Sequence, residues 1–142
     1  MRPDKFTSQL QEALADAQSL AVGRDHNYIE PVHLLHALLE QKQGSAVQLL
    51  AQAGADMQRL KSLTAQYIDR LPSVQNPDGE IRFSQDVARV FNKTDKIAQQ
   101  RGDQYIASEL LLLALLDDKS DAGKALRESG VSKDRLEAVI NQ

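Results

Sequence analysis

The sequence predicts an all-α fold of eight helices, arranged as two pseudo-symmetric repeats of four helices each. Apolar residues recur at helical spacing along most of the chain, and no segment alternates with a period of two for long enough to form a convincing strand. Alanine and leucine dominate the apolar residues while aromatic residues make up only 4% of the chain, which favours helix over sheet. The third observation is an internal duplication, which predicts the two repeats.

The duplication appears when the sequence is shifted by 77 residues. The aligned pairs include Thr7 with Ser84, Leu14 with Phe91, Leu20 with Ile97, Arg24 with Arg101 and Ile29 with Ile106. After a slip of one residue, Gly54 aligns with Gly130. The single domain 1–142 therefore divides into repeat one at about 7–70, a connector at 71–83 and repeat two at 84–142.

The connector contains Pro72, Pro77 and the pair Asp78-Gly79, which are typical of turns. A four-helix unit of this size cannot bury all its apolar faces alone. We therefore expect the two repeats to pack on each other with pseudo-twofold symmetry.

The first two helices of repeat one begin at recognisable residues. Thr7 stands where its hydroxyl can cap a helix with regularly spaced apolar residues up to Ala21. After a loop at 23–29, Pro31 suits the first position of the second helix, because its missing N–H would have been unpaired there in any case.

The third and fourth helices are bounded in the same way. Ser45 can cap a third helix that ends at Gly54, and Asp56 can cap a fourth that runs to about Asp69. Repeat two follows the same plan, with these boundary residues: Ser84, Gly102, Ser120, Gly130 and Ser132.

Composition excludes several classes of function. The net charge is −3 with acids and bases mixed along the chain, whereas a nucleic-acid-binding protein needs a basic stripe to replace the counterions of phosphates. The chain has no cysteine for disulfides or thiolate chemistry. Its first ten residues lack the apolar region of a signal peptide, and the apolar run 110–116 is shorter than the roughly 20 residues that cross a bilayer. We expect a cytoplasmic protein without nucleic-acid or membrane partners.

Four stretches of the sequence resemble the N-terminal domains of the ClpB disaggregases of the Clp family. They are LADAQSLA at 14–21, YIEPVHLLHALL at 28–39, SQDVARVFN at 84–92 and RGDQYIASELLLLALL at 101–116. The resemblance covers residues 1–142 and implies a two-repeat Clp N-domain that engages unfolded or aggregated client proteins. It also implies a full-length protein that forms a homohexameric ring, uses ATP and magnesium, and cooperates with the DnaK chaperone system.

The ATPase modules of such proteins are not expected in this chain. No G-x-x-x-x-G-K-[ST] phosphate loop occurs in its 142 residues, so we expect neither enzyme activity nor a cofactor in this domain. The chain is interpreted as a domain excised from a longer ATPase.

A metal site at Glu30, His33 and His36 is considered and rejected. Their spacing is that of a carboxylate–imidazole site, but such di-metal sites need paired motifs. The matching places in repeat two hold Ala107 and Leu110. With three clustered histidines and no suitable partners, no catalytic residue is predicted either.

The run Leu110 to Leu116 consists only of leucine and alanine. A helix needs three or four apolar positions in seven to face a core, so more than one face of this helix must be covered. In repeat one, His33 and His36 stand at the positions that match Leu110 and Leu113. This indicates that the corresponding helix face in repeat one is partly exposed to solvent. In repeat two the same face is either buried internally or exposed to a partner, and both alternatives remain open.

The resemblance implies an apolar groove for extended client segments. Its positions correspond here to Phe91, Ile97 and Leu110, and we add Leu113 because it shares a helix face with Leu110. A further groove position, usually apolar in close relatives, is Lys93, which narrows the groove rather than removing it because a lysine stem can cover apolar surface.

Three polar residues also correspond to positions linked to chaperone activity in the family: Thr7, Asp103 and Glu109. Each has a structural alternative. Thr7 is a good helix cap, Asp103 follows a helix-ending glycine, and Glu109 suits the first turn of the next helix.

The leading hypothesis is therefore a client-binding module of a disaggregase. The alternative is a docking domain for a folded adaptor protein, as in protease-coupled Clp relatives. A third hypothesis is a mobile plug that only controls access to the pore.

Overall fold

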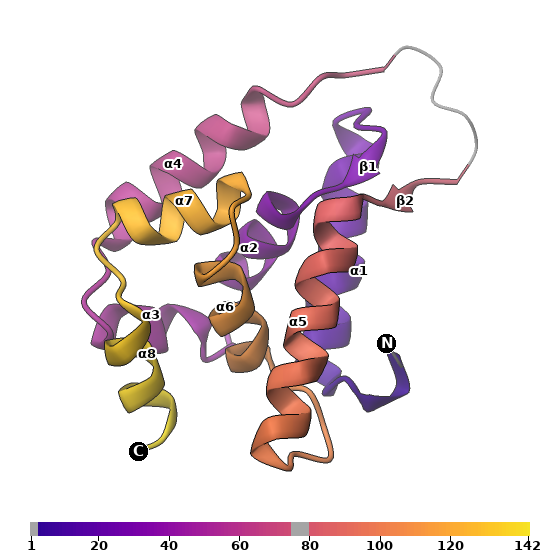
Figure 1. Ribbon diagram of the computed structural model, residues 1–142. Coiled ribbons are helices and arrows are strands. Elements are labelled where there is room, and N and C mark those ends of the chain that lie inside the picture. The colour runs from indigo at the N-terminus through magenta and orange to yellow at the C-terminus, as the bar shows by residue number, and fades with distance from the viewer. Residues whose placement is uncertain (1–2, 75–79) are drawn as a thin grey trace.

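The computed structural model describes residues 3–74 and 80–142, and the turn predicted at Pro77 and Asp78-Gly79 lies outside these ranges. The described part contains eight α-helices, as predicted (Figure 1). They are α1 (Ser8–Gly23), α2 (Pro31–Glu40), α3 (Ala46–Gln52), α4 (Met57–Asp69), α5 (Gln85–Arg101), α6 (Ser108–Leu116), α7 (Asp121–Glu128) and α8 (Lys133–Ile140). A short 3₁₀ helix, η1 (Pro3–Lys5), precedes them.

Most of the predicted caps are present. The side chains of Thr7, Asp56, Ser84 and Ser132 each accept a hydrogen bond from the backbone N–H three residues later, at 3.1–3.3 Å. Pro31 is the first residue of α2, where its missing N–H removes no helical hydrogen bond.

Two of the predicted caps work differently. Ser45 and Ser120 stand directly before α3 and α7, but their side chains make no capping hydrogen bond. The positions of these helices are therefore set by packing more than by their first residues.

The two repeats pack with the expected reciprocity. Helix α4 of repeat one contacts α7 of repeat two, and α3 contacts α8, which is the same pairing with the repeats exchanged. Gly54 and Gly130 occupy matching positions with φ of +94° and +97°. A Cβ on Gly130 would lie 3.4 Å from the Gly54 carbonyl oxygen, so the duplicated glycines meet where the repeats meet.

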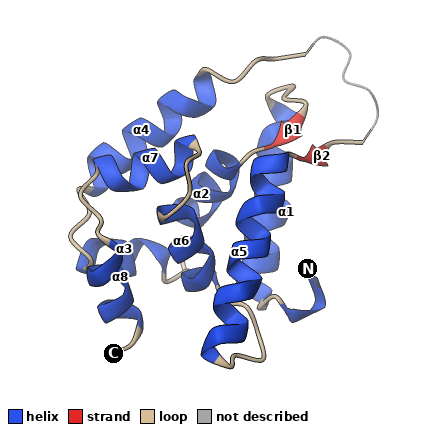
Figure 2. Ribbon diagram, viewed as in Figure 1, coloured by secondary structure: helices blue, strands red, loops and turns tan. Residues whose placement is uncertain are grey.

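The expectation that the chain forms no strand is corrected by two very short strands (Figure 2). Strand β1 (Tyr28–Ile29) pairs in parallel with β2 (Arg82–Phe83), joining Ile29 to Phe83. An isolated parallel bridge joins Phe6 to Ile106, which is the same pairing with the repeats exchanged. Strands of two residues are too short for a period of two to show in the sequence.

The core is built around α2 and α6, which contact each other. Every side chain from Leu110 to Leu116 is at most 5% exposed, so the apolar run is core. Helix α2, which matches α6 in repeat one, is also more buried than predicted. His33 is fully buried at 0% exposure, and only His36 is half-buried.

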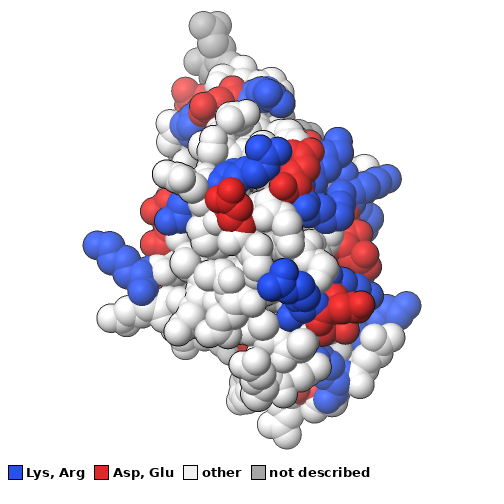
Figure 3. All heavy atoms as spheres, turned by 90° about the vertical axis from the view of Figure 1, so that its left-hand side faces the viewer, with Lys and Arg blue, Asp and Glu red and all other residues white. Residues whose placement is uncertain are grey.

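The charged side chains are spread over the surface. Figure 3 shows acids and bases interspersed on the face at the left of Figure 1, around a broad uncharged area. Charges of mixed sign create no strong field for a polyanion on this face. Within residues 3–74 and 80–142, no helix is both long enough and apolar enough to span a membrane.

Candidate functional site

Helix α5 positions two of the predicted contact residues, Phe91 and Ile97. The face of α5 that points into the core carries Val87, Val90, Thr94 and Ala98, all buried. Phe91 and Ile97 are both half-buried and stand six residues apart, which places them about 120° apart around the helix. They therefore flank opposite edges of the core face, and the structure does not bring them into one groove.

Phe91 belongs to an aromatic group that it forms with Phe6 and Phe83. Its ring centroid lies 5.9 Å from that of Phe6 and 5.2 Å from that of Phe83, both in edge-to-face geometry. Phe6 is buried, whereas Phe83 is 49% exposed. The group thus runs from the core to the surface and leaves an aromatic edge in contact with solvent.

Thr7 lies beside this group and holds two segments together. Its backbone N–H donates to the carbonyl of Ile106 at 3.0 Å, while its hydroxyl caps α1. The Ile106 N–H donates in turn to the Lys5 carbonyl at 2.7 Å. Thr7 has a clear structural role here, and its predicted role in client contact stays a prediction.

Ile97 lies in a separate cleft, which is formed by α5, α6 and α8. The cleft has a volume of about 370 Å³, and its apolar lining comes from Ile97 and Leu113. Leu113 is only 5% exposed, so it forms the floor while Ile97 forms a wall. The structure therefore brings together two of the predicted residues, Ile97 and Leu113.

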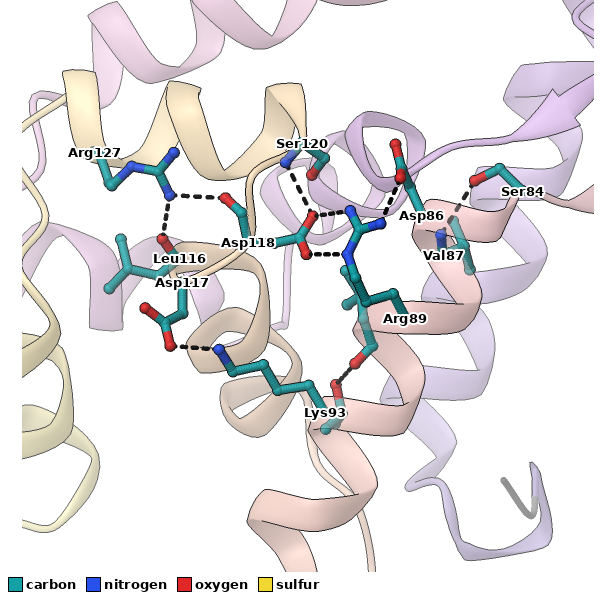
Figure 4. Close-up of polar contacts among 12 residues, drawn as sticks. Ser84, Asp86, Val87, Arg89, Lys93, Leu116, Asp117, Asp118, Ser120 and Arg127 are labelled. Carbon is teal, nitrogen blue, oxygen red and sulfur yellow. Dashed lines mark hydrogen bonds and ion pairs between the residues drawn. The ribbon is translucent and has the colours of Figure 1, made fainter.

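Lys93 borders this cleft. Its ammonium group pairs with the carboxylate of Asp117, which follows the last residue of α6 (Figure 4). The hydrogen bond from Lys93 lowers the pKa of Asp117. Lys93 thus links α5 to the end of α6 at the edge of the cleft, and its predicted effect on the width of a client groove stays a prediction.

The other predicted residues contribute less to this cleft. Leu110 is 2% exposed and offers almost no surface to a partner. Asp103 is exposed, with its carboxylate 3.4 Å from the guanidinium of Arg101, which itself lines the cleft. Glu109 is half-buried in the first turn of α6. The set of seven residues is thus divided between the aromatic group, the cleft and the core.

An ion-pair network that the sequence analysis missed holds α5 against the loop between α6 and α7 (Figure 4). Arg89 donates two hydrogen bonds to the Asp118 carboxylate, at 2.9 and 3.0 Å, and one to Asp86 at 2.7 Å. The backbone N–H of Ser120 also donates to Asp118, at 3.0 Å. One nitrogen of Arg127 donates to the backbone carbonyls of Leu116 and Asp118, each at 2.8 Å.

The environment of Asp118 stabilises its charged form. Its side chain is only 5% exposed, and burial by itself would raise its pKa. The hydrogen bonds from Arg89 and Ser120 outweigh that effect, so the pKa of Asp118 is lowered. In repeat one, Glu12 and Gln41 stand at the positions that match Arg89 and Asp118. This difference between the repeats is the feature of the sequence that could have indicated the network.

The rejected metal motif has a structural explanation. The Glu30 N–H donates to His33 Nδ1 at 2.8 Å, so the proton of neutral His33 is on Nε2. That nitrogen lies 2.9 Å from Nδ1 of buried His26 and donates to it. Burial, followed by the neighbouring His26, lowers the pKa of His33 to about 4. Across the described ranges, no three His, Cys, Asp or Glu side chains gather as metal ligands.

Comparison with known proteins gives consistent matches. The model of the Clp repeat (R) N-terminal domain matches residues 5–129. The chaperone protein ClpB of Pseudomonas putida is 55% identical over 141 residues, which is 99% of this chain and 16% of that protein. The chain thus spans about a sixth of the length of such curated relatives, at 16–17% of each.

Two solved structures extend these matches. The Hsp104 N-terminal domain of Candida albicans has a TM-score of 0.83 and 27% identity, covering 95% of this chain and 88% of that one. A ClpV N-domain in complex with a VipB peptide has a TM-score of 0.75 and 22% identity, covering 94% and 82%. The second likeness shows the fold alone.

Proposed function

The chain belongs to the Clp repeat N-terminal domain family, and from this premise we propose that it is the client-binding domain of an ATP-driven disaggregase. The family model describes an N-terminal domain and not an ATPase module, so this chain is a binding domain rather than an enzyme. Its task would be to capture exposed apolar segments of unfolded or aggregated proteins and present them to the ATPase ring.

The observation that carries the proposal is the cleft between α5, α6 and α8. It is open to solvent, and two of the residues predicted for client contact, Ile97 and Leu113, supply its apolar lining. A volume of about 370 Å³ has room for one large apolar side chain of an extended segment, since ligand pockets begin at roughly 300 Å³. The solvent-exposed edge of Phe83, packed on Phe91, offers a second apolar contact.

The size of this surface implies weak binding. Leu113 is already buried, so the gain comes mainly from client side chains that cover half-buried Ile97 and the exposed edge of Phe83. Each such contact gains at most roughly 1.5–3 kcal/mol, and ordering the client offsets much of this gain. The expected Kd is therefore about 10 μM to 1 mM. Weak binding suits a domain that must release its client, and about six copies on one ring would raise avidity by orders of magnitude.

An amide NMR titration with a permanently unfolded client tests the proposal. Shifts are expected at Ile97 and Leu113, with a second set around Phe91 and Phe83. No shift at millimolar client would contradict the proposal.

A second function, docking of a specific adaptor protein, is favoured by one observation. The ClpV N-domain, which has the same fold, has been solved with a VipB peptide bound. A panel of unrelated unfolded peptides separates the two functions. Weak binding to many peptides supports client capture. No binding to the peptides, together with tight binding to one protein, supports docking.

The remaining properties of the full-length protein belong to the same proposal. They are a homohexameric ring, ATP and magnesium in separate modules, cooperation with the DnaK system and a cytoplasmic location. The plug hypothesis predicts that no change in the cleft alters client binding.

A further inference from the structure

The rim of the cleft between α5, α6 and α8 is more basic than the chain as a whole. Four cationic side chains line it, together with only two acidic ones, Asp117 and Glu137. The cations are Lys93, Lys96, Arg101 and Lys133. This local excess of positive charge stands in a protein whose net charge is −3.

The four cations differ in how far they are already neutralised. Lys93 pairs with Asp117, and Arg101 lies 3.4 Å from the Asp103 carboxylate and donates to the Asn141 side chain at 2.9 Å. For Lys96 and Lys133, no carboxylate of the described chain lies within ion-pair distance. Both ammonium groups are therefore available to an anion on a bound molecule.

Lys96 and Lys133 belong to different sides of the cleft, because Lys96 is on α5 and Lys133 begins α8. Both lysines line the same cleft as Ile97 and Leu113, so the residues that flank an apolar side chain inserted there come close to this rim. An extended chain advances about 3.3 Å per residue, so residues next to the inserted side chain reach the rim. Acidic flanking residues would meet unpaired positive charge there.

We infer that this cleft selects client segments in which an apolar side chain is flanked by acidic residues. The inference rests on the proposed function and adds to it a preference among clients. Apolar contact, mainly with half-buried Ile97 above the floor formed by Leu113, supplies the affinity, and Lys96 and Lys133 supply the selection. Asp117 is already paired with Lys93, so Glu137 is the acid on the rim that an anionic partner has to avoid.

The test uses three fluorescent peptides with the same apolar centre and with flanks of Asp, Ser or Lys. The acidic peptide should bind about 3- to 10-fold tighter than the neutral one, because two exposed charge pairs contribute modestly. Raising the salt from about 50 to about 300 mM should remove most of this difference. The Lys96→Glu/Lys133→Glu variant should lose or reverse the preference and still bind the neutral peptide.

The matched control is Lys42→Glu/Lys61→Glu, which changes the net charge equally at two exposed lysines outside the cleft. It should keep the acidic preference. If both double variants lose the preference equally, overall charge is responsible and the inference is overturned. If the neutral peptide binds and the acidic one binds no tighter, the inference fails while the proposed function stands.

Two further outcomes are distinguishable. If no peptide binds at millimolar concentration, the proposed function itself fails. If a single-stranded oligonucleotide binds tighter than the acidic peptide and loses affinity in Lys96→Glu/Lys133→Glu, the cleft binds nucleic acid and the inference is overturned.

Discussion

Replacing Arg89 with methionine should destabilise the domain by removing the partner of a buried carboxylate. Asp118 is 5% exposed and accepts two of its three hydrogen bonds from Arg89, so the variant leaves only the Ser120 N–H. Breaking a fully buried pair costs about 3–5 kcal/mol, but Arg89 is 39% exposed and solvent screens it. We therefore expect a loss of roughly 2–3 kcal/mol in the free energy of unfolding.

Urea denaturation followed by far-UV circular dichroism measures this loss. The matched control is Arg24→Met, which removes an exposed pair with Asp69 whose side chains are 43% and 65% exposed. That pair should contribute at most about 1 kcal/mol. Equal losses in the two variants would refute the argument that burial of Asp118 makes the network important.

The pH dependence of the same experiment follows from the direction of the pKa. The pKa of Asp118 is lower in the folded state than in the unfolded state, so its contribution is present above the unfolded value of about 4. It is lost as the pH falls through the lower, folded value. The difference between wild type and Arg89→Met should therefore be constant near pH 7 and shrink below about pH 4. A difference that grows on acidification would contradict the assignment.

Two further predictions concern stability. His33 has a folded pKa of about 4, below its unfolded value near 6.5, so stability should be full above about pH 6.5 and fall by roughly 2 kcal/mol at about pH 5. His33→Gln should show a smaller loss between pH 7 and pH 5 in urea denaturation, and an equal loss would contradict the assignment. Gly123→Ala should cost about 1–3 kcal/mol or prevent folding, because a Cβ there would lie 2.0 Å from the Asp118 carbonyl oxygen. A Cβ at Gly23 would have no atom within 4 Å, so Gly23→Ala should leave the thermal stability equal or higher. Equal losses of stability in the two variants would refute the packing argument.

Local chemistry explains why much of the fold was predictable. Capping by Thr7, Asp56 and Ser84 depends on neighbours three residues away, so the sequence contains the whole motif. The duplication also predicted the packing of the repeats, because matching residues such as Gly54 and Gly130 occupy matching places.

The missed features depend on residues that are distant in sequence. Arg89 and Asp118 are 29 positions apart, and in the sequence only their departure from the duplicated pattern sets the two positions apart. His33 is buried because His26 and the Glu30 N–H satisfy both of its ring nitrogens, which a polarity argument alone does not reveal.

The candidate site was predictable only in part for the same reason. The apolar run predicts that several faces of the helix with Leu110 and Leu113 are covered, but it does not identify the residues or the partner that cover them. In the structure both leucines are buried in the core. The sequence-based prediction places Phe91 and Ile97 in one groove, although six residues on a helix correspond to about 120° of rotation and already argue against this. That separation indicates two apolar contacts on α5 where the resemblance implied one groove.

The most direct test of the account is the Kd for an unfolded client, compared between Ile97→Ser and Leu20→Ser. These residues match in the duplication and both are half-buried, so the two variants remove equivalent side chains from the two repeats. We expect Ile97→Ser to weaken binding about 3- to 10-fold, because the apolar wall of the cleft is lost, and Leu20→Ser to leave the Kd unchanged. Equal Kd values for two folded variants would contradict the claim that the cleft between α5, α6 and α8 binds clients.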